Sequence, residues 1–377
     1  MLPNLAKMPD FNAPLVANLR VKNPSSQFRA WPFRKLLTML QVNKSLRVSI
    51  VTGILMLPVT LFALPEGAEV VGGSVELKKP DAKTILVKQN SNKAAIEWRK
   101  FNVNKSELVK FSQPGSNSHI LNRVMEQDPS HIFGKIEANG RVFLVNPNGI
   151  IFGETSEVNT GSFVASGLDL DSKAFLKGNF EFKSRKGEAG FVINKGTIKA
   201  AGGEVTLIGK QVENQALILA RAGTVSLAAG DYVVLDFEGN GLLKIAVKAP
   251  SALGQKVLAA AVTNSGRISA QNVLLSAEIA QNAFSAAVNN EGVIEAKKLV
   301  NAGGNIRLVG EGGATMNSGT LAAAEPKGKG GLIEVLGPKV ILHKESSLDA
   351  SGASGGGKIL VGGDFQGSNP FGKECKA

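Results

Sequence analysis

The sequence predicts an all-β protein, a right-handed parallel β-helix (solenoid) with an amino-terminal cap and extra-helical hairpins. Two observations indicate this fold. Short apolar segments recur at intervals of 20, 26 and 27 residues, and the 377 residues include 43 glycines but only two tryptophans and one tyrosine. A fixed period of this length is typical of stacked coils, because a single coil cannot cover its apolar face and a stack can.

The repeats share a short pattern in which Asn is followed by Gly two residues later and by an aliphatic residue four residues later. Clear copies begin at Asn194, Asn264, Asn290 and Asn317, and looser copies begin at Asn214 and Lys344. Alternating strands such as 204–208 place Val, Leu and Ile inside each coil. We expect each Asn either to visit the left-handed region or to bond in a ladder between coils, and each Gly to relieve the turn sterically.

The ends of such a stack would expose unpaired strand edges, which favour aggregation. We therefore expect the segment from about Leu64 to Ser91 to act as an amino-terminal cap. Asn240-Gly241 lies between the apolar runs 232–237 and 242–247. This arrangement predicts a hairpin that leaves the helix.

The first 63 residues carry most of the net positive charge, +7 of the total of +12. They hold eight of the 43 Lys and Arg residues but one of the 31 Asp and Glu residues, in a chain with a net charge of +12. No basic run with interleaved aromatic residues follows, so nucleic acid is not expected as a partner. The single cysteine, Cys375, excludes a disulfide framework or a cysteine-based metal site within the chain.

Residues 48–62 form an apolar run preceded by Lys44 and Arg47. The run is shorter than the roughly 20 residues of a membrane span and has the length and flanks of a secretory signal. We expect a signal peptide over residues 39–63, with the natural start at Met39, and a disordered leader over the proline-rich residues 1–38. An uncleaved signal anchor is the alternative, because Leu61 rather than a small residue precedes the proposed cleavage site.

The stretch from Asn122 to Gly153 consists of short apolar strands punctuated by turns. Asn139-Gly140 and Asn148-Gly149 tolerate positive φ, so each predicts a tight reversal between strands. Pro147 fixes its own φ and biases the residue before it toward extended geometry.

Four blocks of sequence follow one another at characteristic spacing: 95–98 with 101–103, 111–114, 122–124 and 146–153. Together they resemble the amino-terminal secretion domain of two-partner-secretion exoproteins, the filamentous haemagglutinin family, and in particular its high-molecular-weight adhesin branch. The similarity runs from about Leu64 to about Pro250 and continues more weakly to Gly367.

The resemblance implies a route of export. The chain would cross the inner membrane through the general secretion machinery, and an outer-membrane β-barrel transporter of the two-partner-secretion type would then thread it outward. Strand addition could hold its extended segments. The resemblance also implies a secretion-recognition or fold-nucleating motif made of Asn122, Arg123, Val124, Asn146, Pro147, Asn148 and Gly149. A second family motif, Asn-Pro-Asn-Leu, is not found in this sequence.

Sequence patterns that mark nucleotide, metal or catalytic sites in other proteins lack, in this sequence, the flanking elements or spacing that such sites need. The stretch 352–358 nearly matches a phosphate-binding loop, but Ile359 follows it and the next element is expected to be a strand. His119, His131 and His343 show no metal-ligand spacing, and the first two are interpreted as polar turn residues. We therefore expect no catalytic residue, no metal and no cofactor.

The alternative function is a β-helical polysaccharide-degrading enzyme, which needs carboxylates clustered on one groove. Asp231, Asp236 and Glu238 are the nearest cluster, although only the last two share a strand face. Asp169 and Asp171 also share a face but have no third partner nearby.

The sequence thus favours a secreted or cell-surface adhesin or haemagglutinin-like exoprotein, with host-cell surface glycans or proteins as further candidate partners. The expected organisation is a leader (1–38), a signal peptide (39–63), a secretion domain (64–250), further β-helix repeats (251–367) and a tail (368–377). A truncated member of the family is an open alternative, because the sequence stops soon after Gly367.

Overall fold

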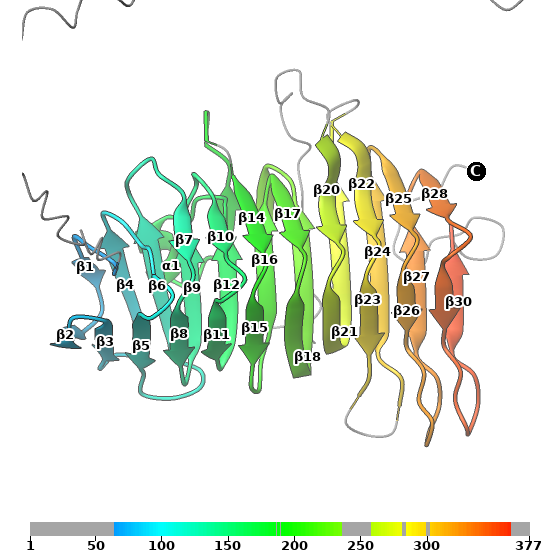
Figure 1. Cartoon of the computed structure of the whole chain (residues 1–377), viewed down its shortest axis with the longest axis horizontal. Helices are drawn as coiled ribbons and strands as arrows, with labels where there is room; N and C mark the ends of the chain where they lie inside the picture. Colours follow the sequence, from blue (N-terminus) through cyan, green and yellow to red (C-terminus); the bar gives the residue numbers. More distant parts are fainter. Residues whose placement is uncertain are drawn as a thin grey trace, which may run out of the picture. The chain divides into compact units, whose positions relative to one another are not determined.

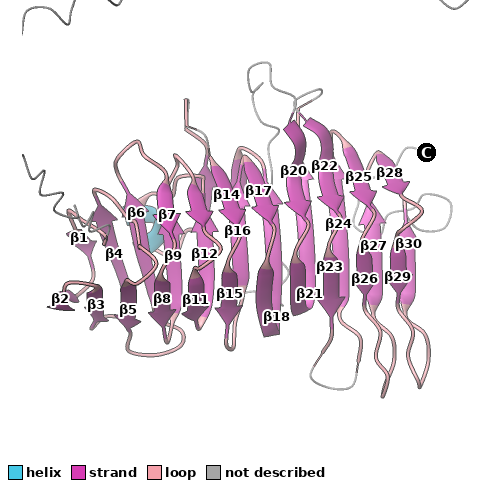
Figure 2. Cartoon of the chain, in the orientation of Figure 1, coloured by secondary structure: helices cyan, strands magenta, loops and turns pink. Residues whose placement is uncertain are grey.

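The computed structural model describes residues 64–185, 187–188, 190–235, 258–280, 284–298 and 302–362. These residues form a parallel β-helix in which the chain winds through three strands per coil (Figure 1). Strands make up nearly all of the regular structure of the described residues, which include one short helix (Figure 2). The predicted fold class is confirmed.

The three strands of each coil belong to three faces, which we number in the order β8, β9 and β10. Face 1 contains the first parts of β18 (Leu217–Ala229) and β21 (Arg267–Glu278). Its other strands are β3 (Thr84–Gln89), β5 (Leu108–Ser112), β8 (Lys135–Ala138), β11 (Glu157–Thr160), β15 (Thr197–Ala200), β23 (Val293–Ala296), β26 (Thr320–Ala322) and β29 (Ser347–Asp349).

Face 2 contains the second parts of β18 and β21. Its other strands are β4 (Lys93–Trp98), β6 (His119–Val124), β9 (Arg141–Val145), β12 (Ser162–Ser166), β16 (Val205–Gly209), β24 (Asn305–Glu311), β27 (Leu332–Leu336) and β30 (Lys358–Val361). The strand predicted after residue 358 is thus confirmed as β30.

Face 3 is a separate sheet of eight parallel strands. Its strands are β7 (Ser130–Ile132), β10 (Ile150–Phe152), β14 (Phe191–Asn194), β17 (Gln211–Asn214), β20 (Leu258–Asn264), β22 (Phe284–Asn290), β25 (Ala314–Asn317) and β28 (Lys339–Leu342).

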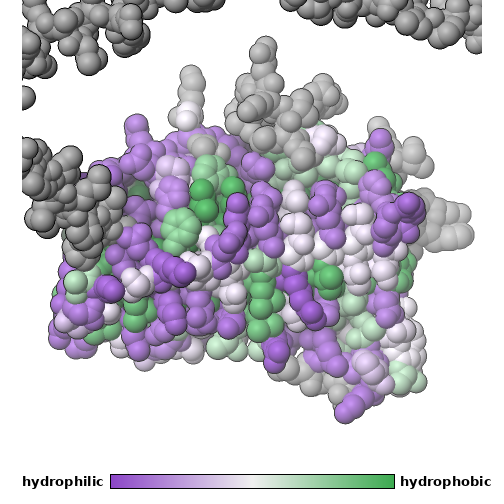
Figure 3. Space-filling view, in the orientation of Figure 1, coloured by the Kyte–Doolittle hydropathy of each residue, from purple (hydrophilic) through white to green (hydrophobic). Residues whose placement is uncertain are grey.

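The core lies inside the coils and consists of apolar side chains stacked at equivalent positions. On face 1, one inward position is aliphatic in every coil from β8 to β26 and its side chains are at most 1% exposed. These residues are Ile136, Val158, Ile198, Ile218, Ile268, Ile294 and Leu321. Burial of each such side chain stabilises the fold by about 1.5–3 kcal/mol. On the viewed side of the molecule, hydrophilic residues cover most of the surface, with small apolar islands between them (Figure 3).

The repeat asparagines form a ladder inside the helix at the corner between faces 3 and 1. Each side-chain Nδ2 donates to Oδ1 of the next asparagine at 2.7–2.8 Å. The ladder runs through Asn194, Asn214, Asn264, Asn290 and Asn317, all 0% exposed. Of the two roles left open by the sequence, the structure shows the ladder.

The glycines of the repeats are required by the neighbouring coil. A Cβ on Gly292 would lie 2.1 Å from the carbonyl oxygen of Gly266, and one on Gly319 would lie 2.0 Å from that of Gly292. The coils therefore approach too closely for a side chain at this corner. In the looser copy at Lys344 the aliphatic residue was placed correctly, since Leu348 is in register with Leu321, but Leu342 rather than Lys344 is in register with Asn317.

Two antiparallel strands cap the amino-terminal end. β1 (Glu69–Gly72) pairs with β4, and β2 (Val75–Asp81) pairs with β3. The exposed β2 carries two lysines and Pro80, which discourage further strand pairing. The predicted cap is confirmed, but it ends before Ser91. β3 already belongs to the β-helix, because it pairs in parallel with β5.

An extra-helical element covers the outer side of face 2. It consists of α1 (Ser172–Leu176) and a pair of antiparallel strands, β13 (Glu181–Lys183) and β19 (Tyr232–Val234). A second apolar core forms beneath it, in which Phe143 of β9 packs against Phe175 and Phe180 of the element. The predicted hairpin at Asn240-Gly241 lies outside the described residues.

The Asn-Gly dipeptides were wrongly predicted to be tight reversals. Asn139-Gly140 and Asn148-Gly149 lie at corners between successive faces, and the strands they connect pair in parallel with neighbouring coils. A corner changes the direction of the chain by less than a hairpin does, so the strands stay in different sheets. Among the described residues, no helix is long and apolar enough to cross a membrane.

Candidate functional site

Two of the predicted motif residues point into the helix. Asn122 lies on β6, where its Oδ1 accepts a hydrogen bond from Trp98 Nε1 (3.0 Å) and its Nδ2 donates to the carbonyl of Phe143 (3.2 Å). Val124 lies two residues further along the same inward side and is 4% exposed. Asn122 therefore connects three successive coils and satisfies an indole N–H that would otherwise be buried without a partner.

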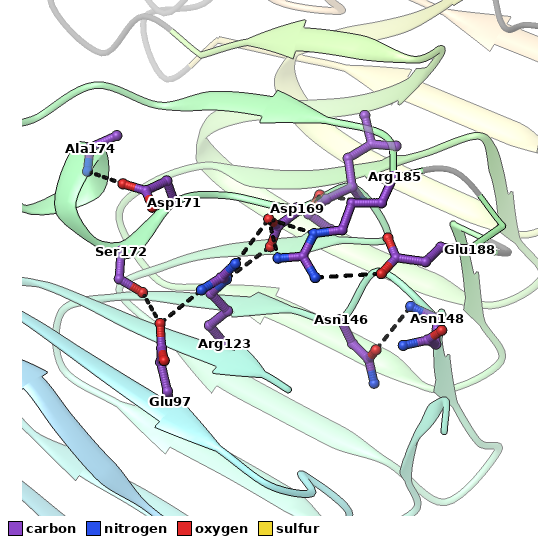
Figure 4. A network of polar contacts seen from close by, with 12 residues as sticks. Glu97, Arg123, Asn146, Asn148, Asp169, Asp171, Ser172, Ala174, Arg185 and Glu188 are labelled. Carbon is purple, nitrogen blue, oxygen red and sulfur yellow. Dashed lines mark hydrogen bonds and ion pairs between the residues drawn. The ribbon is translucent and has the colours of Figure 1, made fainter. Parts of the chain in front are cut away.

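Arg123 points outward, toward the extra-helical element. Its guanidinium donates to both oxygens of Asp169 (2.9 and 3.0 Å) and to Glu97 Oε1 (2.8 Å). Figure 4 shows it between these two carboxylates, with Ser172 beside Glu97 and Arg185 on the far side of Asp169. Arg185 donates to Asp169 at 2.6 Å and Ser172 to Glu97 at 2.8 Å. We call these five residues the clasp, since they join β4 and β6 to the extra-helical element.

The centre of the clasp, Arg123 with its two carboxylates, is largely withdrawn from water, whereas Arg185 at its edge is 44% exposed. The Arg123 side chain is 11% exposed and that of Asp169 is 15% exposed. Burial alone would lower the pKa of Arg123, but hydrogen bonds and charges from Asp169 and Glu97 outweigh it and raise this pKa above its usual range. The guanidinium is therefore a permanent cation that anchors the element by bidentate, charge-assisted hydrogen bonds.

Asn146, Pro147, Asn148 and Gly149 form the corner between β9 and β10. Asn146 Oδ1 accepts from the Asn148 N–H (3.0 Å), and the Asn146 carbonyl accepts from the Gly149 N–H (2.9 Å). The first bond makes an Asx turn, and the second closes a β-turn over the four residues 146–149. The corner fixes the direction in which the chain enters face 3.

The same corner is bonded to the coils on both sides of it. Asn146 Nδ2 donates to the Asp128 carbonyl (2.9 Å) and to Ser130 Oγ (3.0 Å) of the preceding coil. On the following side, the carbonyl of Pro147 accepts from the Gly190 N–H (3.0 Å). An asparagine amide is needed here, because a carboxylate could not donate these bonds.

Gly149 has φ of 115° and lies under the ring of Phe191. A Cβ would lie 2.4 Å from Phe191 Cζ. We predict that Gly149→Ala destabilises the protein by about 1–3 kcal/mol, because it adds backbone strain and a clash. Urea unfolding would measure this, with Gly115→Ala as control, since a Cβ there meets nothing within 4 Å. Equal losses of stability in Gly149→Ala and Gly115→Ala would mean that position 149 does not require glycine.

The structure brings the two halves of the motif to neighbouring coils and buries most of it. Asn122, Val124, Asn146, Pro147 and Gly149 are buried, while Arg123 and Asn148 are partly exposed. In the folded domain, the motif offers little surface to a partner. The arrangement holds coils and the extra-helical element together, and it has no nucleophile or general base aimed at a cavity.

The histidines predicted to be polar turn residues are strand residues. His131 lies on β7, and His119 lies on β6, stacked on Phe143 (6.0 Å) and on Phe180 (5.9 Å). Burial, assisted by the positive charges of Arg141 and Lys93, lowers the pKa of His119 from 6.5 to about 4.

This shift makes stability depend on pH. His119 takes up a proton near pH 6.5 in the unfolded chain but only near pH 4 in the folded chain. The stability that neutral His119 contributes to the folded state is therefore complete above pH 6.5 and is lost as the pH falls to about 4. We predict that His119→Phe loses less stability than the parent between pH 7 and pH 5 in urea unfolding. The same pH dependence in both proteins would contradict this role.

Two of the carboxylates considered for an enzyme, those of Asp169 and Asp171, have structural partners. Asp169 is held by two arginines, and Asp171 caps α1 by accepting from the Ala174 N–H (2.8 Å). The Asp231 carbonyl accepts from the Ser184 N–H (2.8 Å) beside β13, and Asp236 and Glu238 lie outside the described residues. Within the described ranges, no group of three or more His, Cys, Asp and Glu side chains could hold a metal ion.

Comparison with known families decides the assignment. The family model of the TPS (two-partner secretion) secretion domain matches residues 63–323, more than half of the chain. The chain belongs to the TPS secretion domain family. The solved HMW1 secretion domain from Haemophilus influenzae has a TM-score of 0.74 and 30% sequence identity to it, covering 82% of this chain and 80% of that one.

Two curated relatives from Haemophilus influenzae are each called heme/hemopexin-binding protein. One, from the Rd strain, is 31% identical over 318 residues, which cover 80% of this chain and 33% of the relative. The other is 36% identical over 121 residues, which cover 32% of this chain and 13% of the relative. This chain therefore spans a third or less of the length of the curated relatives that it matches.

The resemblance to two-partner-secretion exoproteins is thus confirmed. Membership of the TPS secretion domain family places this chain among exported proteins, secreted or at the cell surface. Family membership does not support a polysaccharide-degrading enzyme.

Sequence reasoning identified Arg123 but missed the rest of the clasp. Glu97 lies within a block that carried the resemblance, and Asp169 had been noted only as a carboxylate. One usable signal is the continuous apolar run Val142–Val145, because a strand that is apolar on both sides is covered on both faces. That run predicts a second layer over face 2.

Proposed function

We propose that this chain is the export-addressing part of an adhesin or haemagglutinin-like exoprotein, and that a two-partner-secretion transporter recognises it before it folds. The observation that carries this proposal is the burial of the motif: Asn122, Asn146 and Pro147 are inaccessible in the folded domain. A transporter that reads these residues must therefore meet them in an extended chain, where strand addition can supply main-chain hydrogen bonds.

On the outer side of the membrane the same residues serve the fold. The corner at Asn146–Gly149 and the clasp form between early coils, so they order the part of the stack on which later coils add. The same motif would thus serve recognition by the transporter first and folding of the β-helix afterwards. The general secretion machinery would deliver the unfolded chain to the periplasm, after removal of a signal peptide over residues 39–63.

The test is export of the full chain from cells that do or do not co-express its transporter. We expect the chain in the medium only with the transporter. Asn146→Ala and Asn148→Ala should lower export, whereas Asn289→Ala on β22 should not. Export that is independent of the transporter, or that is unchanged by both motif variants, would overturn the proposal.

Adhesion is the second part of the proposed function. The relatives named above include the secretion domain of HMW1 and proteins that bind heme or hemopexin, so the complete exoprotein would act at a surface or on a ligand outside the cell. Host-cell surface glycans or proteins are the proposed targets. Binding of the secreted full chain to cultured epithelial cells, against a secreted control protein, would test this part.

A further inference from the structure

A depression of about 390 Å³ lies on face 2, where β4 and β6 begin. Asn92 and Lys93 line it at the start of β4, and His119 lines it at the start of β6. The loop 114–118, which connects β5 to β6, forms the remaining wall, and its residues Ser116 and Asn117 are exposed. The lining is therefore polar and reaches the solvent.

Three basic side chains lie in a row at this place. Lys93, His119 and Arg141 are in register on β4, β6 and β9, and each of them directly precedes an inward residue of the core. Because side chains alternate along a strand, all three point outward, and successive positions in the row are about 4.8 Å apart. The row therefore places a permanent cation on either side of the imidazole.

Among the described residues, no carboxylate offsets the positive charge at His119. After burial, the charges of Arg141 and Lys93 are the next largest causes that lower the pKa of this histidine, and no Asp or Glu is among the groups that shift it. A neighbouring carboxylate would act in the opposite direction, as Glu97 and Asp169 do at Arg123. The row thus differs from the clasp, where the cation and the carboxylates are paired.

The Lys93 ammonium is held at the depression without a partner among the described residues. It makes no hydrogen bond or ion pair with any of them, and its side chain is partly exposed. The ammonium lies beside the backbone of Gly178, the residue with φ of 85° that follows α1, where a Cβ would come within 2.9 Å of Nζ. The turn after α1 therefore leaves room for this cation, and an anion in the depression would pair with it.

The arrangement favours a phosphate group over a carboxylate or a nucleic acid. A phosphomonoester carries a charge of about −1.5 to −2 at pH 7 and three strong acceptor oxygens, so it can meet several donors at once. A carboxylate brings one charge and two oxygens. Binding of single-stranded nucleic acid uses exposed aromatic platforms, whereas the rings beside this site, Phe143 and Phe180, are buried and stacked on His119.

We propose that this depression binds a phosphomonoester, with the charges of Lys93 and Arg141 on the phosphate and a hydrogen bond from Asn117 at the rim. The phosphate belongs either to a soluble molecule or to a lipid headgroup, and the experiment separates these two sources. The site is distinct from the export motif. Its binding is measured on the folded, secreted chain, so its failure is separable from a failure of export.

The test is calorimetric titration of the full chain with glycerol 3-phosphate, and with acetate, at pH 7 and low ionic strength. The parent should bind glycerol 3-phosphate more tightly than acetate. Lys93→Gln should bind it at least about tenfold more weakly, since a charge-assisted contact is lost. Asn117→Asp should weaken binding by at least as much, because it places a negative charge at the rim, and the exposed position of Asn117 makes this variant harmless to the fold.

The matched control is Lys195→Gln, which removes the same charge from an exposed position just after β14. It should change the affinity by less than about twofold, because distant surface charges are screened. Equal losses in Lys93→Gln and Lys195→Gln would overturn the site in favour of non-specific attraction. Binding of acetate as tight as that of glycerol 3-phosphate would overturn the choice of a phosphomonoester.

Vesicles of phosphatidylcholine with and without phosphatidic acid distinguish the two sources of the phosphate. Cosedimentation of the parent with phosphatidic acid vesicles alone, lost in Lys93→Gln, would support a lipid headgroup as the ligand. Binding of glycerol 3-phosphate without cosedimentation would support a soluble phosphomonoester. Absence of binding by the parent to glycerol 3-phosphate and to both kinds of vesicle would overturn the proposal outright.

Discussion

Arg123→Ala is expected to destabilise the folded domain by about 3–5 kcal/mol, because it leaves two poorly exposed carboxylates without their shared cation. The Arg123 guanidinium donates to Asp169 through Nε and Nη2 and to Glu97 through Nη1. Asp169 keeps Arg185 and Glu97 keeps Ser172, so the element should loosen before the coils do. Urea unfolding gives the free energy, and hydrogen exchange over β13 and α1 shows where protection is lost first.

Arg267→Ala is the matched control for this variant. Arg267 pairs with Glu295 at 2.8 Å, but the two side chains are 60% and 37% exposed. Exposed pairs contribute about 0–1 kcal/mol. A loss for Arg123→Ala that is no larger than the loss for Arg267→Ala would mean that the clasp does not hold the extra-helical element.

Asn290→Ala is expected to destabilise the domain by about 2–4 kcal/mol, because it interrupts the asparagine ladder between Asn264 and Asn317. Asn264 would lose its best acceptor and Asn317 its donor, and both amides are fully buried. Asn290→Leu should not restore stability, since an apolar side chain of similar size leaves the same two partners unsatisfied. Thermal and urea unfolding of the purified chain would measure both variants.

The adjacent Asn289→Ala provides the control within the same strand. Asn289 points away from the core, and among the described residues its side-chain amide donates only to Glu291 Oε1 (2.7 Å) at the surface. Its loss should change stability by less than about 0.5 kcal/mol. If Asn289→Ala and Asn290→Ala were equally costly, the ladder would not be a source of stability.

The repeats made most of the fold predictable. Asparagine and aliphatic residues at constant offsets have one physical cause, the stacking of identical positions in adjacent coils, and the registers of Ile198, Ile218 and Ile268 follow it. The corner dipeptides were harder to interpret. Asn-Gly suits both a hairpin and a β-helix corner, and only the pairing of the next strand distinguishes the two.

The extra-helical element was not predictable in the same way. Its parts interrupt the period between β12 and β14 and again between β18 and β20. Its contacts with face 2 join residues far apart in sequence, such as Arg123 and Asp169, which are 46 positions apart. No local pattern encodes such a pair. The motif residues were found through family resemblance, but their burial, which limits what they can do in the folded state, required the structure.

The most direct test of the central claim compares two states of one chain. The transporter's isolated periplasmic domains would be immobilised and exposed either to the folded, secreted chain or to the same chain freshly diluted from urea. We predict that the freshly diluted chain binds and that binding fades as it folds, with Asn146→Ala binding more weakly. Equally tight binding of the folded chain would contradict the proposal that the export motif is recognised before folding.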